Sequence, residues 1–86
     1  MDPSKDEIIV GHRLAELLRQ QGRLYEAEAV RAVKKEFGMA FLQRSRGGGW
    51  KIARGVNRVF SEITPGFVWS TREKLWRIRR PSDSKN

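Results

Sequence analysis

Apolar residues recur with the spacing of an α-helix in three segments of this chain, and glycine or proline follows each segment. In the first segment, one apolar stripe is formed by Val10, Leu14, Leu17 and Leu18. Ser4 and Glu7 precede the stripe with the spacing of a capping box, and Gly22 follows it. The pattern predicts a helix that begins after Ser4 and ends at Gly22.

The second segment predicts a helix from about Leu24 to Phe37, closed by Gly38. Its main apolar positions are four residues apart, at Tyr25, Ala29, Val33 and Phe37. Because the connection to the first helix is short, residues 5–37 are expected to form a helical hairpin with antiparallel or sharply crossed helices. The acidic first turn and basic last turn complement the helix dipole, so we expect these charges to be structural and the function to lie elsewhere.

The third segment carries its apolar stripe at Ile52, Val56, Val59 and Ile63. The stripe predicts an amphipathic helix that Thr64-Pro65-Gly66 ends. Between the second and third helices, residues 39–45 have the composition of a short edge strand, and Arg46-Gly47-Gly48-Gly49 follows as a loop.

The last segment is typical of a β-hairpin, and its register can be derived from the positions of its apolar residues. A turn centred on Arg72 and Glu73 places Trp69 opposite Trp76 and Phe67 opposite Ile78. These four side chains then share one face, which predicts the register because a slip by one residue would mix arginines with tryptophans. The opposite face is then mostly polar and contains Val68, Ser70, Leu75, Arg77 and Arg79.

The expected fold class is therefore α+β, with three helices and a small antiparallel sheet in the order helix, helix, strand, helix, β-hairpin. This order resembles a winged helix, whose third helix presents its polar face to the DNA major groove and whose hairpin contacts the backbone. The predicted order departs from that pattern because its short strand follows the second helix, not the first. We expect one domain over residues 4–80, with flexible ends at 1–3 and 81–86.

Positive charge is concentrated in the second half of the chain. The chain has 86 residues and a net charge of +8, and residues 41–86 contain eleven basic and three acidic side chains. Such clustering is unfavourable unless a partner offsets it, and a polyanion is the commonest partner. Nucleic acid is therefore the leading expectation, an acidic protein surface is the second, and a merely solubilising charged surface is the third.

The candidate nucleic-acid-binding residues lie on three expected elements. On the polar side of the third helix they are Lys51, Arg54, Asn57 and Arg58, with Ser61 beside them. Before the glycines they are Arg44 and Arg46, and in the hairpin they are Arg72, Lys74, Arg77 and Arg79. The alternatives are an ordinary solvated helix face and, for the hairpin arginines, protection of a sheet edge from aggregation.

Trp50 follows the three glycines and is a candidate for stacking on a base or for anchoring a protein partner. Core packing is the interpretation we favour for it, and Trp69 and Trp76 are likewise expected in the core. The glycines lack the pattern of a nucleotide phosphate loop, and a mobile connection is the ordinary interpretation of such a run.

No catalytic site is predicted. The chain has no cysteine, its one histidine, His12, has no nucleophile partner nearby, and no carboxylate pair has the spacing of an acid–base or metal motif. We therefore expect a protein that is not an enzyme and that has no metal and no cofactor. We also expect a cytoplasmic location without membrane insertion, since no long apolar run or secretory signal is present.

Two partner hypotheses follow. In the first, the protein binds nucleic acid, with double-stranded DNA contacted at its phosphates. In the second, it is an interaction module or inhibitor that occupies an acidic or DNA-binding site of a host protein, with Trp50 or an outward Leu75 as anchor. The chain is expected to be a monomer or a homodimer, with the strand at 41–45 available for pairing.

A set of positions over about residues 24–80 resembles a family of short bacterial and phage proteins of unknown function. The positions are Leu24-Tyr25, Ala29-Val30, Phe37-Gly38, Ile52, Val56, Phe60, Thr64, Val68-Trp69 and Trp76-Arg77-Ile78-Arg79. The Gly-Gly-Gly before Trp50 departs from the Gly-Asn turn of that family. The resemblance implies no reaction and no cofactor, and it favours a phage or mobile-element setting.

Overall fold

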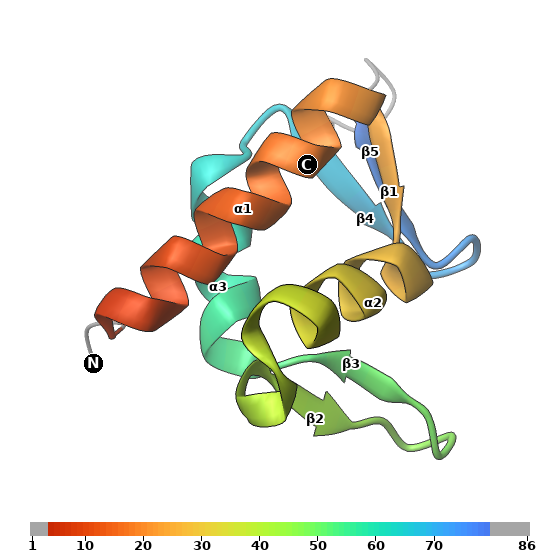
Figure 1. Cartoon of the computed structure of the whole chain (residues 1–86). Helices are drawn as coiled ribbons and strands as arrows, with labels where there is room; N and C mark the ends of the chain where they lie inside the picture. The colour runs from red at the N-terminus through yellow and green to blue at the C-terminus, as the bar shows by residue number, and fades with distance from the viewer. Residues whose placement is uncertain (1–3, 80–86) are drawn as a thin grey trace.

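The computed structural model describes residues 4–79 of the chain and has an α+β fold. Three helices pack with two small antiparallel sheets (Figure 1). The elements in order are α1 (Lys5–Gln21), β1 (Arg23–Tyr25), α2 (Glu26–Phe37), η1 (Met39–Phe41), β2 (Leu42–Arg44), β3 (Trp50–Ile52), α3 (Arg54–Ile63), β4 (Phe67–Ser70) and β5 (Leu75–Ile78). The predicted fold class is thereby confirmed, while the ends predicted at 1–3 and 81–86 lie outside the described residues.

Helix α1 begins and ends where the sequence predicts. The Ser4 hydroxyl accepts a hydrogen bond from the Glu7 backbone N–H at 3.1 Å, and the Glu7 carboxylate accepts one from the Ser4 N–H at 2.8 Å. This is the complete capping box. At the other end, Gly22 adopts a left-handed conformation with φ of 80° and donates its N–H to the Leu18 carbonyl.

The second helix begins at Glu26, two residues later than predicted from Leu24, because Arg23–Tyr25 forms strand β1. Leu24 lies opposite Trp76 of β5 and is buried. The expectation that no strand follows the first helix was therefore wrong, whereas the short strand expected between the second and third helices is present as β2. Pairing with a strand about fifty residues away overrides the helical spacing of Leu24 and Tyr25, and no local pattern reveals such a contact.

The C-terminal hairpin has the register that the sequence predicts. Trp69 lies opposite Trp76 and Phe67 opposite Ile78. With β1 added, the sheet has the order β1-β5-β4, so β5 is its central strand. Leu75 on this central strand is buried between its neighbours on both sides, and the prediction of an outward anchor there was wrong.

The segment between α2 and α3 is a second hairpin, of which only one strand was predicted. Strand β2 pairs with β3, and Leu42 lies opposite Ile52, with both side chains buried. Helix α3 therefore begins at Arg54, and Lys51 and Ile52 belong to a strand, not to the helix as expected. Ile52 fits both patterns, because it stands four residues before Val56 and also two residues after Trp50.

Helix α1 packs closely on α3 and holds it in place. A Cβ atom at Gly11 would lie only 2.7 Å from the Val59 Cγ1, so the crossing requires glycine at that position. Arg19 of α1 donates a hydrogen bond from Nη2 to the carbonyl of Ile63, the last residue of α3, at 2.8 Å. Helix α1 thus buries one face of α3, and the opposite face of α3 is left to form a site.

A guanidinium and two carboxylates join α1 to α2. The Arg13 Nε donates to Glu36 at 2.9 Å, and the Arg13 Nη1 donates to Glu16 at 2.8 Å. The hydrogen bond from Arg13 holds the pKa of Glu36 below its ordinary value, and the Glu36 carboxylate is the main cause of the raised pKa of Arg13. Charges on this side of the molecule are therefore partly neutralised by one another.

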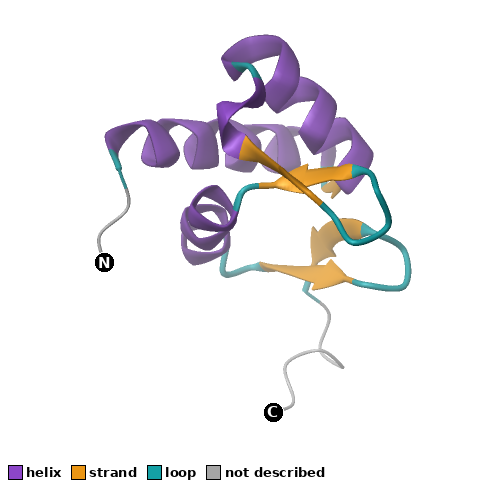
Figure 2. Cartoon of the chain, turned by 90° about the horizontal axis from the view of Figure 1, so that it is seen from below, coloured by secondary structure: helices purple, strands orange, loops and turns teal. Residues whose placement is uncertain are grey.

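The two hairpins leave opposite ends of α3 and point to the same side of the molecule. Strand β3 enters the N-terminal end of α3, and β4 follows its C-terminal end. Figures 1 and 2, viewed at right angles to each other, show both hairpin turns on the side away from α3. Of the helices described within residues 4–79, none has the length and apolar character to cross a membrane.

Candidate nucleic-acid interface

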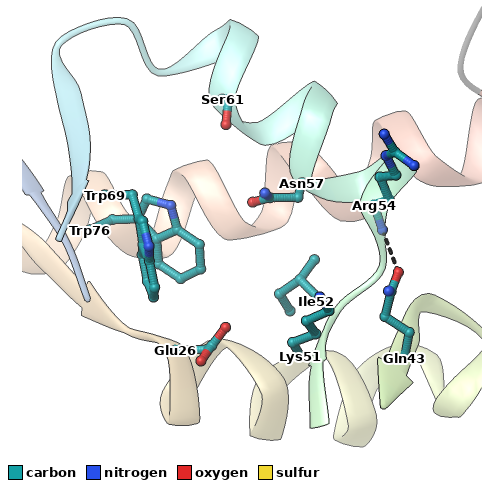
Figure 3. Close-up of a pocket in the computed structure, with 9 residues that line it drawn as sticks. All are labelled: Glu26, Gln43, Lys51, Ile52, Arg54, Asn57, Ser61, Trp69 and Trp76. Atoms are coloured by element: carbon teal, nitrogen blue, oxygen red, sulfur yellow. Dashed lines mark hydrogen bonds between the residues drawn. The ribbon is translucent and has the colours of Figure 1, made fainter. Parts of the chain in front are cut away.

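A cleft of about 470 Å³ lies between the two hairpins, with α3 along one side (Figure 3). It is lined by Glu26, Gln43, Lys51, Ile52, Arg54, Asn57, Ser61, Trp69 and Trp76. These residues come from both hairpins and from two helices. Hairpin β2–β3, which lies between α2 and α3 in the chain, therefore supplies part of the lining of the cleft.

Two indole rings form one end of the cleft. The Trp69 and Trp76 rings lie 4.6 Å apart between centroids, and Trp76 packs edge-on against Phe60 of the core at 5.0 Å. Trp76 is 7% exposed, whereas Trp69 is 38% exposed. Trp69 therefore offers an accessible aromatic surface that a buried ring supports from behind, and it is only in part the core residue that the sequence analysis expected.

Two basic residues border the other end of the cleft, Lys51 on β3 and Arg54 at the start of α3, and the Arg54 guanidinium points outward from this end (Figure 3). The Gln43 side-chain oxygen accepts the Arg54 backbone N–H at 2.9 Å and caps the helix, because Ala53 has no side-chain acceptor. Within residues 4–79, neither the Lys51 ammonium nor the Arg54 guanidinium belongs to an ion pair. Both cations are therefore available to an anion.

Polar groups line the middle of the cleft. Asn57 and Ser61 are one helical turn apart on α3, and in the described part of the chain neither side chain has a hydrogen-bond partner. Across from them lies the side chain of Glu26, the first residue of α2 (Figure 3). The backbone N–H of Glu26 donates a hydrogen bond to the Lys74 carbonyl at 2.9 Å. The cleft thus presents hydrogen-bond donors and acceptors between a cationic end and an aromatic end.

Other predicted binding residues lie outside the cleft. Arg58 approaches Glu62 at 3.6 Å on an exposed part of α3, where both side chains remain 65% exposed. Arg44 places its guanidinium 5.0 Å from the centre of the Trp50 ring and donates to the Gly48 carbonyl at 3.2 Å. Trp50 itself is 40% exposed, so the preferred interpretation of it as a core residue was wrong.

The remaining predicted cations divide between the hairpin turns and the sheet. Arg46 lies in the β2–β3 turn, and Arg72 and Lys74 lie in the β4–β5 turn, where all three are exposed. Arg77 follows Trp76 on β5 and therefore lies on the opposite face of the sheet, beside Arg23. Arg79 donates from Nε to the Pro65 carbonyl at 3.3 Å. The structure thus brings Lys51, Arg54 and Asn57 into one cleft and places Arg77 away from it.

Besides the buried Ile52 and Trp76, three residues that line the cleft were not predicted as site residues: Glu26, Gln43 and Trp69. The exposure of Trp69 follows from its place on β4, an edge strand, whereas Trp76 lies on the central strand. Without β1 the hairpin has no central strand, so the two tryptophans look equivalent in the sequence. Gln43 gives no signal at all, because its role depends on a contact between elements.

The family model that matches this chain covers residues 10–78 and is described as a family of unknown function, DUF6953. The chain belongs to this family. The match begins well before residue 24 and includes most of α1, so it is wider than the resemblance found in the sequence. No curated protein and no solved structure is significantly similar to the chain.

The description of the DUF6953 family names no ligand and no activity. Among residues 4–79, no cluster of three or more histidine, cysteine or carboxylate side chains is arranged to hold a metal ion. The groups that the cleft does offer are two cations, an exposed indole, two amides, a hydroxyl and a carboxylate. These groups suit recognition of a partly anionic, partly aromatic ligand.

Proposed function

We propose that this DUF6953 protein is a binding module, not an enzyme, and that it contacts the phosphates of nucleic acid. The observation that carries the proposal is the placement of Lys51 and Arg54, without acidic partners in the described residues, in the cleft between two hairpins. Three further cations, Arg46, Arg72 and Lys74, lie on the turns of those hairpins. Phosphate contacts of this kind supply most of the affinity of sequence-independent binding.

Electrostatic differences between the two sides of the molecule support this proposal. On the α1–α2 side, Arg13 is held by Glu16 and Glu36. On the cleft side, two cations, Lys51 and Arg54, and one carboxylate, Glu26, line the cleft, and the hairpin turns add more positive than negative charge. A polyanion approaching the protein is therefore attracted to the hairpin side.

The test is a fluorescence anisotropy titration of a labelled dodecanucleotide, single-stranded and as a duplex, at several salt concentrations. If about five phosphates are neutralised, the logarithm of the binding constant should fall against the logarithm of salt with a slope of about −3.5 for a single strand and −4.5 for a duplex. The double variant Lys51→Ala/Arg54→Ala should lose affinity by at least about tenfold and make the slope less steep by about 1.4 for a single strand and about 1.8 for a duplex.

The matched control is Arg31→Ala/Lys35→Ala, which removes the same charge from the exposed side of α2. It should change affinity by less than about threefold, because only long-range attraction is lost and salt screens it. Equal losses in the two double variants, or no binding to either nucleic acid, would contradict the proposal.

A second candidate function has one observation in its favour. Trp50 is 40% exposed beside Arg44, and tryptophan and arginine are both enriched at the energetic centres of protein interfaces. The alternative is an interaction module that occupies an acidic surface of a host protein, in the phage or mobile-element setting that the resemblance favours. Capture from a host lysate with and without nuclease separates the two, since a stoichiometric protein that survives nuclease and is lost in Trp50→Ala supports the alternative.

A further inference from the structure

We infer that the cleft holds an unpaired nucleotide of a single strand, with the base against Trp69 and the phosphate beside Lys51 and Arg54. This inference rests on the proposed function and specifies its ligand. It concerns the choice between a duplex and a single strand, which the distribution of charge alone does not make.

The placement of the polar face of α3 between two hairpins argues against insertion into a duplex groove. Asn57 and Ser61, the polar residues expected to reach base edges, lie inside the cleft and between the two hairpins (Figure 3). A recognition helix must project, because with its side chains it nearly fills a major groove about 12 Å wide. Here β2–β3 and the tryptophan pair stand on either side of that polar face, so a ligand must enter the cleft instead.

The exposed ring of Trp69 suits an unpaired base. Its orientation is fixed by Trp76 at 4.6 Å, which is fixed in turn by Phe60 at 5.0 Å, so little side-chain freedom remains to be lost when a base stacks. In a duplex both faces of an internal base are covered by its neighbours, whereas in a single strand they are accessible. An aromatic platform of this kind is therefore useful mainly to unpaired bases.

The distribution of charge in the cleft matches the two ends of a nucleotide. Lys51 and Arg54 lie at the end away from the tryptophans, and Glu26 lies between the two (Figure 3). A phosphate is attracted to the first end, while the Glu26 carboxylate repels it and accepts hydrogen bonds from the amino group of a base. The volume of about 470 Å³ falls in the range of ordinary small-ligand sites.

The experiment compares Trp69→Ala with Trp50→Ala, since these two tryptophans are 38% and 40% exposed on different hairpins. With the labelled single-stranded dodecanucleotide, Trp69→Ala should lose affinity by about 5-fold to 150-fold, the range measured for removing one base–aromatic stack. Trp50→Ala should lose less than about threefold. The same sequence as a duplex should bind more weakly than the single strand and respond to neither change.

A second pair of variants covers the case in which Trp69→Ala does not fold. Trp69→Phe keeps an aromatic ring and should keep most of the affinity, whereas Trp69→Leu keeps apolar packing against Trp76 and should lose it. Thermal unfolding followed by circular dichroism establishes that both are folded. Equal affinity of the two folded variants would overturn the stacking role.

The outcomes separate this inference from the function on which it rests. If the duplex binds as tightly as the single strand and Trp69→Ala changes nothing while Lys51→Ala/Arg54→Ala weakens both, the inference is wrong and nucleic-acid binding stands. If neither nucleic acid binds, both are wrong. If adenosine 5′-monophosphate displaces the dodecanucleotide at equal concentration, the cleft is a site for a free nucleotide, and the assignment to a strand is wrong.

Discussion

The two hairpins on either side of α3 are built differently. Hairpin β4–β5 belongs to a three-stranded sheet, and its Trp76 is part of the core. Hairpin β2–β3 has only two strands, and it is attached to the core by Leu42 and Ile52. The first hairpin can therefore present Trp69 in a fixed orientation, while the second presents Arg44, Arg46 and Trp50 on a less supported element.

The largest expected effect is a difference in stability between tryptophans of the two hairpins. Trp76→Ala removes a buried ring that contacts Phe60 and Trp69, and it should lower the free energy of unfolding by about 3–5 kcal/mol. Trp50→Ala removes an exposed ring and should cost less than about 1 kcal/mol. Urea denaturation measures both, and comparable losses would show that the second hairpin is anchored as firmly as the first.

An intermediate effect on stability is expected in the two hairpin turns. Each turn has a residue with positive φ, which is a glycine in one turn and a lysine in the other. Gly48 of the β2–β3 turn has φ of 97°, and Lys74 of the β4–β5 turn has φ of 59°. Gly48→Ala should destabilise the protein by about 1 kcal/mol, and Lys74→Gly should stabilise it by about 0.5 kcal/mol, because glycine adopts positive φ without steric cost.

Differential scanning calorimetry gives both turn effects, and opposite shifts of the unfolding temperature are expected. Shifts of the same sign would mean that one of the two turns relaxes to another conformation when it is altered. Lys74→Gly also removes one of the cations assigned to phosphate contact, so stability and affinity should change in opposite directions.

The smallest expected effect is the pH dependence of the α1–α2 contact. The pKa of Glu36 is held below its ordinary value of 4.5 by the hydrogen bond from Arg13. A carboxyl whose pKa is lower in the folded state stabilises the protein above its unfolded pKa, and this contribution is lost as pH falls through the folded value. The wild type should therefore lose more stability between pH 5 and pH 3 than Glu36→Gln does, as measured by urea denaturation at each pH. Parallel curves would show that Arg13 and Glu36 are not coupled in solution.

The features that could be predicted from the sequence are those that depend on contacts between residues close together in the chain. The capping box at Ser4, the end of α1 at Gly22 and the register of Trp69 with Trp76 follow from neighbouring residues, and all three were confirmed. Strand β1 was missed because its three residues are defined by pairing with β5.

The candidate site was predictable only in part, for the same reason. Arg54 and Asn57 could be placed on the polar face of α3 by helical spacing alone, and Lys51 was included although it belongs to β3. That this face lies in a cleft depends on where β2–β3 and the tryptophan pair pack. Glu26 and Gln43 enter the site through that packing, which no local pattern in the sequence encodes.

The most direct test of the account is a titration of the ¹⁵N-labelled protein with the unlabelled single-stranded dodecanucleotide, followed by NMR. We expect the largest shifts at the backbone amides of Lys51, Arg54 and Asn57 and at the indole N–H of Trp69. The exposed side of α2 around Arg31 should remain unchanged. Shifts concentrated on α1 and α2, or spread evenly over all exposed cations, would contradict it.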